Sequence, residues 1–214
     1  LVAVEAAVNT TVTSVTTTSR EAYTRDNKEV QALMEKLEPA EDFYRVEKKT
    51  RKTKNDGAWM NFPSVSLFSS TANADLTKFF KRMGCEASTN AYSIIGSTPL
   101  VDSLLSVRYA LYSEYIPNTD LVNYIQESGG TYLYENLYTL PLGFVLPYDL
   151  ADNWQYQMEN PAEVQNDLCL LLGTDDVLVP VEAEVSGSGC TFTADMAGEY
   201  YVYIQNKKVK NVKA

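Results

Sequence analysis

The sequence predicts an α/β domain, with a mixed α+β arrangement as the alternative, in which helices pack on a small mixed sheet. Up to about residue 174, segments of strand composition alternate with helices of roughly ten residues. After that point apolar residues recur at every second position, which predicts a short C-terminal β-hairpin or meander module. Because 45% of the 214 residues are hydrophobic, the chain can bury a core of its own.

Helices are expected wherever apolar residues recur at the spacing of one helical face. The first covers residues 26–37, where Asp26 and Glu29 have the spacing of a capping box and Pro39 stops the helix. Four more are expected over residues 76–83, 98–105, 119–128 and 160–172. Two of these begin at prolines and three are followed by glycines, namely Pro99, Pro161, Gly84, Gly129 and Gly173.

Strands are expected where β-branched and aromatic residues are enriched or alternate with polar residues. These segments are residues 43–47, 107–112, 131–134 and 143–146, and in the C-terminal module residues 179–185, the residues around Phe192 and residues 200–204. A charged loop is expected over residues 48–56. Residues 9–22 are rich in threonine and serine, which favours an extended or irregular connection or an edge strand.

The composition excludes several classes of function. With 18 Lys and Arg against 28 Asp and Glu, the net charge of -10 disfavours a nucleic acid as partner. The chain has no histidine, which excludes catalysis by Ser/His/Asp or Cys/His groups and His-ligated zinc. We expect neither a metal nor a cofactor.

The three cysteines, Cys85, Cys169 and Cys190, are widely spaced and form no CxxC pair, so they predict neither a metal site nor a thioredoxin-like motif. Cys169 lies in a run of leucines, and Cys190 alternates with Phe192 and Ala194. We therefore expect buried free thiols, with one disulfide as the less favoured alternative.

Six motifs in one order carry a resemblance to a known family. They are Asp42–Glu47, Asn55–Asp56, Ser66–Thr71 with Asn73, Ser97–Tyr109, Tyr134–Asn136 and Leu140–Gly143. Over about Glu5 to Asn166, and weakly beyond, this series resembles the extracytoplasmic region of YfhO-like proteins, which are large multi-spanning bacterial membrane proteins. Ser106 departs from the family pattern, in which glycine or asparagine is expected before Val-Arg-Tyr, and residues 59–60 are also unusual.

The resemblance implies a part of a GT-C type membrane glycosyltransferase, which takes sugars from polyprenyl-phosphate carriers and decorates cell-envelope polymers such as teichoic acids. In such enzymes the acidic catalytic residue lies between early membrane helices, so the active site is expected outside this chain. The implied partners are the rest of its own membrane-embedded chain, an envelope glycopolymer and a polyprenyl-phosphate-linked sugar. The implied place is the outer side of the cell membrane.

The residue patterns and the family resemblance together predict three parts of the chain. Residues 1–22 would be a linker after a membrane segment of a longer parent protein, residues 23–174 the extracytoplasmic α/β domain, and residues 175–214 a small β module. The lysine-rich segment 207–213 is either an edge strand protected from pairing or a piece of a sheet that continues past the sequence. No run approaches the roughly 20 apolar residues that span a bilayer.

The most distinctive charged feature is a basic cluster within seven residues of an acidic protein, formed by Lys48, Lys49, Arg51, Lys52 and Lys54. At a membrane surface it could attract anionic headgroups or a carrier phosphate. The favoured alternative is a solvated loop, because most charge runs are solvated.

Charged, polar and aromatic residues supply the candidates for contact with a sugar or acceptor: Arg45, Glu47, Asp56, Trp59, Asp102, Arg108, Glu135, Asn136 and Trp154. Arg45, Glu47, Asp102 and Arg108 could share one ion-pair network, with a structural role as the default. Trp59, Trp154 and the many tyrosines could stack on sugar rings or fill the core, and Trp154 is the one expected to be exposed.

These observations predict an accessory domain that binds acceptor or shapes a cleft and does not itself catalyse. Two rivals remain. One is a free-standing secreted carbohydrate-binding module. The other, less favoured, is a glycoside hydrolase that would use two carboxylates such as Asp56 and Glu135 across a cleft.

Overall fold

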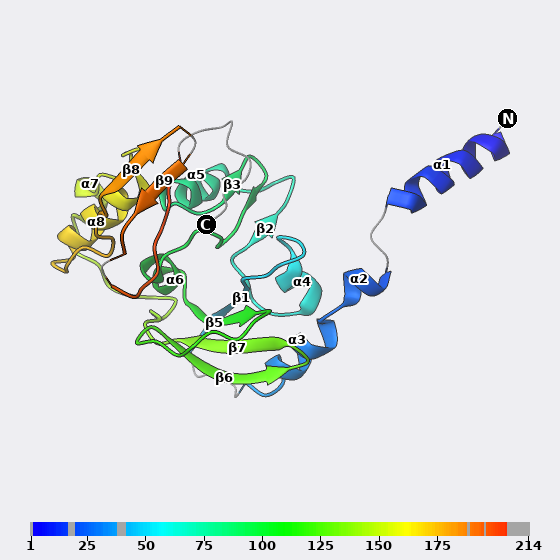
Figure 1. Ribbon diagram of the computed structural model, residues 1–214, viewed down its shortest axis with the longest axis horizontal. Coiled ribbons are helices and arrows are strands. Elements are labelled where there is room, and N and C mark those ends of the chain that lie inside the picture. The colour runs from blue at the N-terminus through cyan, green and yellow to red at the C-terminus, as the bar shows by residue number, and fades with distance from the viewer. Residues whose placement is uncertain (1, 17–19, 38–41, 188, 195, 205–214) are drawn as a thin grey trace.

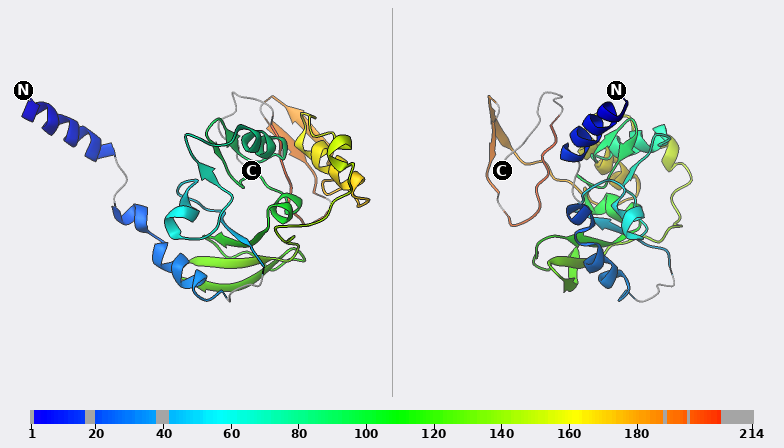
Figure 2. Two further views of the ribbon diagram at one scale, coloured as in Figure 1. Left: turned by 180° about the vertical axis from the view of Figure 1, so that it is seen from behind. Right: turned by 90° about the vertical axis from the view of Figure 1, so that its right-hand side faces the viewer.

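The computed structural model describes all residues except 1, 17–19, 38–41, 188, 195 and 205–214. Its helices are α1 (Val2–Thr16), α2 (Arg20–Thr24), α3 (Asn27–Met34), α4 (Asp56–Met60), α5 (Ala74–Arg82), α6 (Pro99–Leu104), α7 (Leu150–Asn153) and α8 (Pro161–Leu171). Together with three small sheets they form a mixed α+β fold, which confirms the predicted class. Helices α1 and α2 extend away from the remaining elements (Figures 1 and 2).

The strands form sheets of four, three and two members. They are β1 (Arg45–Lys48), β2 (Leu67–Phe68), β3 (Ala87–Ser88), β4 (Ala91–Tyr92), β5 (Val107–Tyr112), β6 (Val122–Ser128), β7 (Thr131–Asn136), β8 (Ala183–Ser186) and β9 (Gly189–Phe192). The four-stranded sheet has the order β1-β5-β7-β6, with β1 parallel to β5 and the other neighbours antiparallel. The sheet is therefore mixed, as predicted.

One face of the four-stranded sheet packs under α3. Val30 and Leu33 of α3 are fully buried against Val46 of β1, Leu111 of β5 and Leu133 of β7. Residues two apart on a strand point to the same side, so the alternate residues of these strands face the opposite side. That opposite face carries the candidate site.

A second core lies between α5, α6, α8 and the three-stranded sheet. Its buried residues are Phe80, Met83, Cys85, Tyr92, Ile94, Val101, Val107 and Val164. Gln165 of α8 is buried here, and its side-chain amide donates to the Met83 carbonyl oxygen at 3.1 Å. This bond fixes α8 to the end of α5.

The helices α5, α6 and α8 confirm the sequence signals for helix ends. The side chains of Asn73, Thr98 and Asn160 accept hydrogen bonds from backbone N–H groups of the first turns. Gly84 and Gly173 follow α5 and α8 with φ of 82° and 71°, a region that glycine adopts without strain. The capping box expected at Asp26 is wrong, because Asp26 has φ 68° and makes no side-chain cap bond.

The helix predicted over residues 119–128 is wrong, because residues 122–128 form strand β6. Leu121, Tyr124 and Ile125 have helical spacing, but exposure alternates residue by residue from Val122 to Ser128. Gly129 and Gly130 connect β6 to β7 in a hairpin and do not cap a helix. Pairing with β7 from Val122 to Ser128, with a register shift between Tyr124 and Gln126, overrides the helical spacing.

Other local predictions also need correction. Residues 143–146 form no strand. An extended connection was predicted over residues 9–22, but residues 9–16 and 20–22 are helical, in α1 and α2. The predicted charged loop contains the start of α4. Pro39 and residues 207–213 lie outside the described residues.

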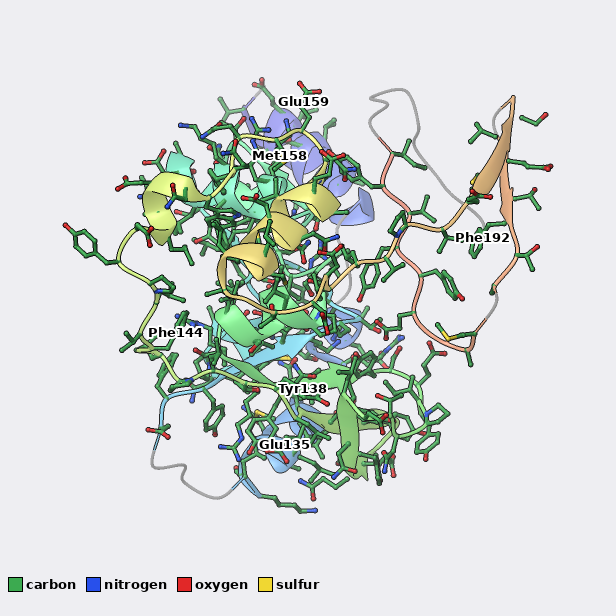
Figure 3. The ribbon with its side chains drawn as sticks, turned by 90° about the vertical axis from the view of Figure 1, so that its left-hand side faces the viewer. Glu135, Tyr138, Phe144, Met158, Glu159 and Phe192 are labelled. Carbon is green, nitrogen blue, oxygen red and sulfur yellow. The ribbon has the colours of Figure 1, made fainter. Side chains whose placement is uncertain are left out.

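The C-terminal module is a single hairpin of β8 and β9 with exposed residues along both strands. Figure 3 shows it, with Phe192 labelled, beside the main body. Residues 200–204 have no regular structure, so the third strand expected there is wrong. Cys85 and Cys169 are buried as expected, whereas Cys190 is exposed, and all three are free thiols.

Candidate functional site

The face of the four-stranded sheet opposite α3 carries an ion pair and a group of tyrosines. Register pairs Glu47 of β1 with Ala110 of β5, Ala110 with Tyr134 of β7, and Tyr134 with Tyr124 of β6. Tyr112 pairs with Tyr132 on the same side, since both lie two residues from this row. We call this surface the sheet-face site, formed by Lys49, Asp102, Tyr112, Tyr115, Tyr124, Tyr132 and Tyr134.

The tyrosine rings of the site contact one another edge to face. Ring centroids are 5.3 Å apart for Tyr112 and Tyr134, 5.6 Å for Tyr124 and Tyr134, and 5.7 Å for Tyr115 and Tyr124. Tyr134 is buried, and its hydroxyl bonds to both the N–H and the carbonyl of Ile116. Tyr115 is 57% exposed, and Tyr124 and Tyr132 are half-buried. The cluster therefore has a fixed centre and an accessible rim.

An ion pair closes the other end of the site. The Lys49 ammonium lies 3.1 Å from Oδ2 of Asp102, the acidic residue in the first turn of α6, and 3.4 Å from the Ser97 hydroxyl. Burial disfavours the charged form of Lys49, but the charge and hydrogen bond of Asp102, together with Tyr112 and Glu47, outweigh burial and raise the pKa of Lys49. The other oxygen of Asp102, Oδ1, is buried and has no hydrogen-bond partner.

The charge of Asp102 also acts on two further side chains, Cys85 and Tyr201. Burial raises the pKa of the Cys85 thiol to about 12, and the charge of Asp102 adds to the effect. Burial also raises the pKa of Tyr201, and Glu199 and Asp102 add to it. The Tyr201 hydroxyl bonds to the Glu199 carboxylate at 2.9 Å. The segment that carries Tyr201 therefore lies beside the ion-paired end of the site.

The basic cluster is bonded within the protein. Lys48 is 8% exposed and, like Lys52, lies within 4 Å of the Asp26 carboxylate, while Lys49 pairs with Asp102. Arg51 and Lys54 both bond to Glu86, Lys54 at 2.7 Å. The cluster is thus not the solvated loop that the sequence favoured. Since every cation of the cluster has a carboxylate partner, a phosphate would have to compete for it.

Glu47 holds a turn of the chain and lies at no open surface. It is 2% exposed, and its carboxylate accepts from the Ser64 hydroxyl at 2.8 Å and the Ser66 hydroxyl at 2.9 Å. It also accepts from the backbone N–H groups of residues 65 and 66. A small pocket lies beside it, lined among others by Arg51, Lys54 and Asp56.

The expected network of Arg45, Glu47, Asp102 and Arg108 does not form, because each has a separate partner. Arg45 donates to the Leu105 carbonyl at 2.7 Å, and Arg108 donates to the Glu135 carboxylate at 2.9 Å. Asn136 donates to the Val107 carbonyl. These contacts are structural bonds between neighbouring segments.

Asp56 and Glu135, the carboxylates considered for hydrolysis, are engaged separately. Asp56 is 5% exposed and accepts from the backbone N–H groups of Lys52 and Thr53 at 2.7 and 2.8 Å. Glu135 pairs with Arg108, and it does not line the pocket that Asp56 lines. Among the residues that the structure describes, no three cysteine or carboxylate groups gather to hold a metal ion.

The two tryptophans differ from expectation. Trp154, predicted to be exposed, is half-buried, and its indole N–H donates to the Val164 carbonyl at 2.8 Å. Trp59 is the more exposed, at 49%, and its ring lies 4.9 Å from that of Tyr23. Neither lies in the sheet-face site.

None of the individual tyrosines of the site was predicted as a candidate from the sequence, although tyrosines as a group were considered for stacking on sugars. The signal was the alternation of Tyr132 with Tyr134, which places both rings on one face. Because residues 119–128 were assigned to a helix, Tyr124 could not be placed beside them. The pairing of Lys49 with Asp102, 53 positions apart, leaves no local signal in the sequence.

Comparison with known proteins gives a single relationship. No curated protein and no solved structure matches the chain. Within the described residues, no helix has both the length and the apolar character that crossing a membrane requires. The family described as "Bacterial membrane protein YfhO" matches residues 1–213, almost the full sequence. The chain therefore belongs to the YfhO family of bacterial membrane proteins.

Proposed function

We propose that this chain is an extracytoplasmic accessory part of a multi-spanning membrane glycosyltransferase and that its sheet-face site binds the glycan acceptor. The donor in this proposal is a polyprenyl-phosphate-linked sugar, and the acceptor is an envelope polymer of the teichoic-acid type. The observation that carries the proposal is the group of partly exposed tyrosine rings beside the Lys49–Asp102 ion pair.

The chemistry of the site suits a sugar. Tyrosine rings offer flat apolar faces with a polar hydroxyl at one end, which matches the apolar faces and polar edges of a pyranose. The half-buried Lys49 ammonium, which is paired with Asp102, offers donors for a sugar hydroxyl. Convergent polar groups at one end of an apolar surface are typical of sites that orient a small molecule.

The charge of the chain favours contact with sugar rings over contact with phosphates. The net charge is -10, and each cation of the basic cluster has a carboxylate partner. Most of this surface would repel the phosphates of a teichoic-acid-type acceptor, so contact is expected through its sugar units. Binding through stacked rings and neutral hydroxyls avoids that repulsion.

A binding role is favoured over catalysis by this chain. The buried carboxylates Glu47 and Asp56 each accept several hydrogen bonds from their own neighbouring segments. A general acid or base needs a proton-transfer path to its substrate. These two carboxylates are oriented by structural donors, so we assign them a structural role.

Calorimetric titration of the purified chain with teichoic acid and with a neutral glucan oligosaccharide tests the proposal. We expect the affinity for the glycan to fall about tenfold in Tyr115→Ala or Tyr132→Ala. A tenfold fall corresponds to a loss of about 1.4 kcal/mol of binding free energy. Tyr148→Ala is the matched control, because Tyr148 is fully exposed outside the site. Equal binding by all variants, or no binding to either ligand, would contradict the proposal.

A further inference from the structure

In the connection between β7 and α7, the first twelve residues, 137–148, form an exposed apolar loop. The twelve residues contain no Asp, Glu, Lys or Arg, although 21% of the chain is charged. Their most exposed side chains are Leu137 (51%), Tyr138 (54%), Leu142 (60%), Val145 (98%) and Tyr148 (103%). In Figure 3, Phe144 of this loop lies at the edge of the body. Large apolar side chains exposed together along one short segment are typical of an interaction site.

The body of the protein fixes both ends of the apolar loop. Leu137 N–H donates to the Leu121 carbonyl at 3.0 Å, and Leu140 N–H donates to the Ser103 carbonyl of α6 at 3.3 Å. At the far end, Leu150 N–H donates to the Pro147 carbonyl at 3.2 Å. The structure therefore holds the middle of the loop, with Leu142 and Val145, away from the core.

We infer that the apolar loop inserts into the interfacial region of a lipid bilayer and so orients this domain on the membrane. The family to which the chain belongs is one of membrane proteins, so a bilayer is the apolar phase at hand. Moving exposed leucine and valine side chains out of water is favourable. Tyr138 and Tyr148 lie near the two ends of the loop and are exposed. Tyrosine is enriched at membrane–water interfaces, where its ring contacts the apolar phase and its hydroxyl contacts water.

The backbone sets the depth of insertion. Residues 141–147 form no helix or strand, so their peptide groups would lose water in the hydrocarbon core without gaining partners. Pro141 and Pro147 carry no N–H group, which removes two donors from the segment. The loop is thus suited to the headgroup and upper acyl region and not to a full span.

Charge selects the kind of lipid surface. Asp149 and Asp152 follow the apolar loop directly, and the whole chain has a net charge of -10. Anionic lipids would repel this part of the surface, whereas zwitterionic lipids would not. Binding through the apolar loop is therefore expected to be strongest on zwitterionic vesicles. Binding through the basic cluster would show the opposite preference.

The test uses the 214-residue chain with an environment-sensitive fluorophore on a single introduced thiol. Val145→Cys in a Cys190→Ser background carries the label, because Cys85 and Cys169 are buried. On phosphatidylcholine vesicles we expect a blue shift and quenching by shallow bromolipids. Val185→Cys in the same background is the control, since Val185 is 78% exposed on the hairpin of β8 and β9.

A second measurement uses matched substitutions in vesicle co-sedimentation. Val145→Asp should lower the vesicle-bound fraction about tenfold, whereas Val185→Asp, with the same charge change, should leave it unchanged. No shift of the label at position 145 on any vesicle, or binding only to anionic vesicles, would overturn the inference. A shift that appears only with the membrane-embedded parent protein would assign the loop to a protein contact instead. Glycan binding at the sheet-face site is measured without lipid, so the two proposals fail separately.

Discussion

Oε2 of Glu47 lies 2.9 Å from the hydroxyl of Ser66, and this bond joins the first strand of the main sheet to the segment that leads into the small sheet. The other oxygen, Oε1, accepts from the Ser64 hydroxyl at 2.8 Å and the Ser66 N–H at 3.1 Å. Because the Glu47 side chain is 2% exposed, water cannot readily replace these bonds. The arrangement makes Glu47 a structural anchor between the two sheets.

Glu47→Ala should lower the free energy of unfolding by about 3 kcal/mol, because it leaves several buried donors without an acceptor. Glu47→Gln should cost roughly half as much, since the amide oxygen can still accept at one position. Urea denaturation measures both. Glu182→Ala is the control, as Glu182 is exposed and its loss should change stability by less than about 0.5 kcal/mol. A Glu47→Ala protein as stable as this control would contradict the structural role.

The backbone conformation of Ser106 accounts for the residue types that the family pattern has at this position. Its φ is 55°, a left-handed conformation that costs a residue with a Cβ about 1–2 kcal/mol. Its carbonyl accepts from the Arg45 N–H at 2.7 Å, which fixes this conformation at the junction of α6, β5 and β1. Glycine or asparagine, which the resemblance leads one to expect here, adopts such a conformation more readily.

Ser106→Gly should therefore stabilise the fold by about 0.5–1 kcal/mol, which raises Tm by about 1–4 °C for a chain of this size. Ser106→Ala keeps the Cβ and should give no such gain. Thermal unfolding followed by circular dichroism compares the two variants. Equal melting temperatures for the glycine and alanine variants would show that backbone strain at Ser106 is negligible.

The sequence predicted those elements whose ends carry chemical signals. Asn73, Thr98 and Asn160 cap their helices through side-chain bonds that short sequence windows reveal. Residues 119–128 were wrongly predicted as a helix because Leu121, Tyr124 and Ile125 have helical spacing. In the structure, exposure alternates along the same segment, as in a strand. Two glycines after it suit a helix end and a hairpin equally well. Only the partner strand β7 decides between them.

The site was less predictable than the fold, because it depends on contacts between distant segments. The sequence shows that Lys49 and Asp102 are charged, but not that α6 brings their side chains to 3.1 Å. Likewise the solvated-loop interpretation of the basic cluster failed because Asp26 and Glu86 lie outside that segment. Ion-pair partners follow from the tertiary fold and not from local composition.

Glu86 links stability to pH. Partial burial favours its neutral form, but hydrogen bonds from Lys54 and Ser93 and the charge of Arg51 outweigh burial, so the pKa of Glu86 is lowered. A lowered pKa in the folded state stabilises the fold above the unfolded pKa, about 4.3, and this contribution is lost as the pH falls through the folded value.

At pH 7 the wild-type protein should therefore have a higher Tm than the Glu86→Gln variant. This difference in Tm should shrink below about pH 4. Salt should also reduce the difference, because the Glu86 side chain is 42% exposed. Melting curves from pH 7 to pH 3, at low and high salt, measure both effects. A difference that stays constant across this range would assign the loss to packing instead of charge.

The three free thiols should differ sharply in reactivity. Burial raises the pKa of Cys85 to about 12, so almost none of it is thiolate at neutral pH, and Cys169 is also buried. Cys190 on β9 is exposed. Since the thiolate is the nucleophile and must meet the reagent, only Cys190 should react promptly with Ellman's reagent at pH 8. We expect one thiol per chain in the native protein, three in urea, and none promptly in native Cys190→Ser. Rapid reaction of a second native thiol would mean that the core around α5 or α8 opens on the timescale of the assay.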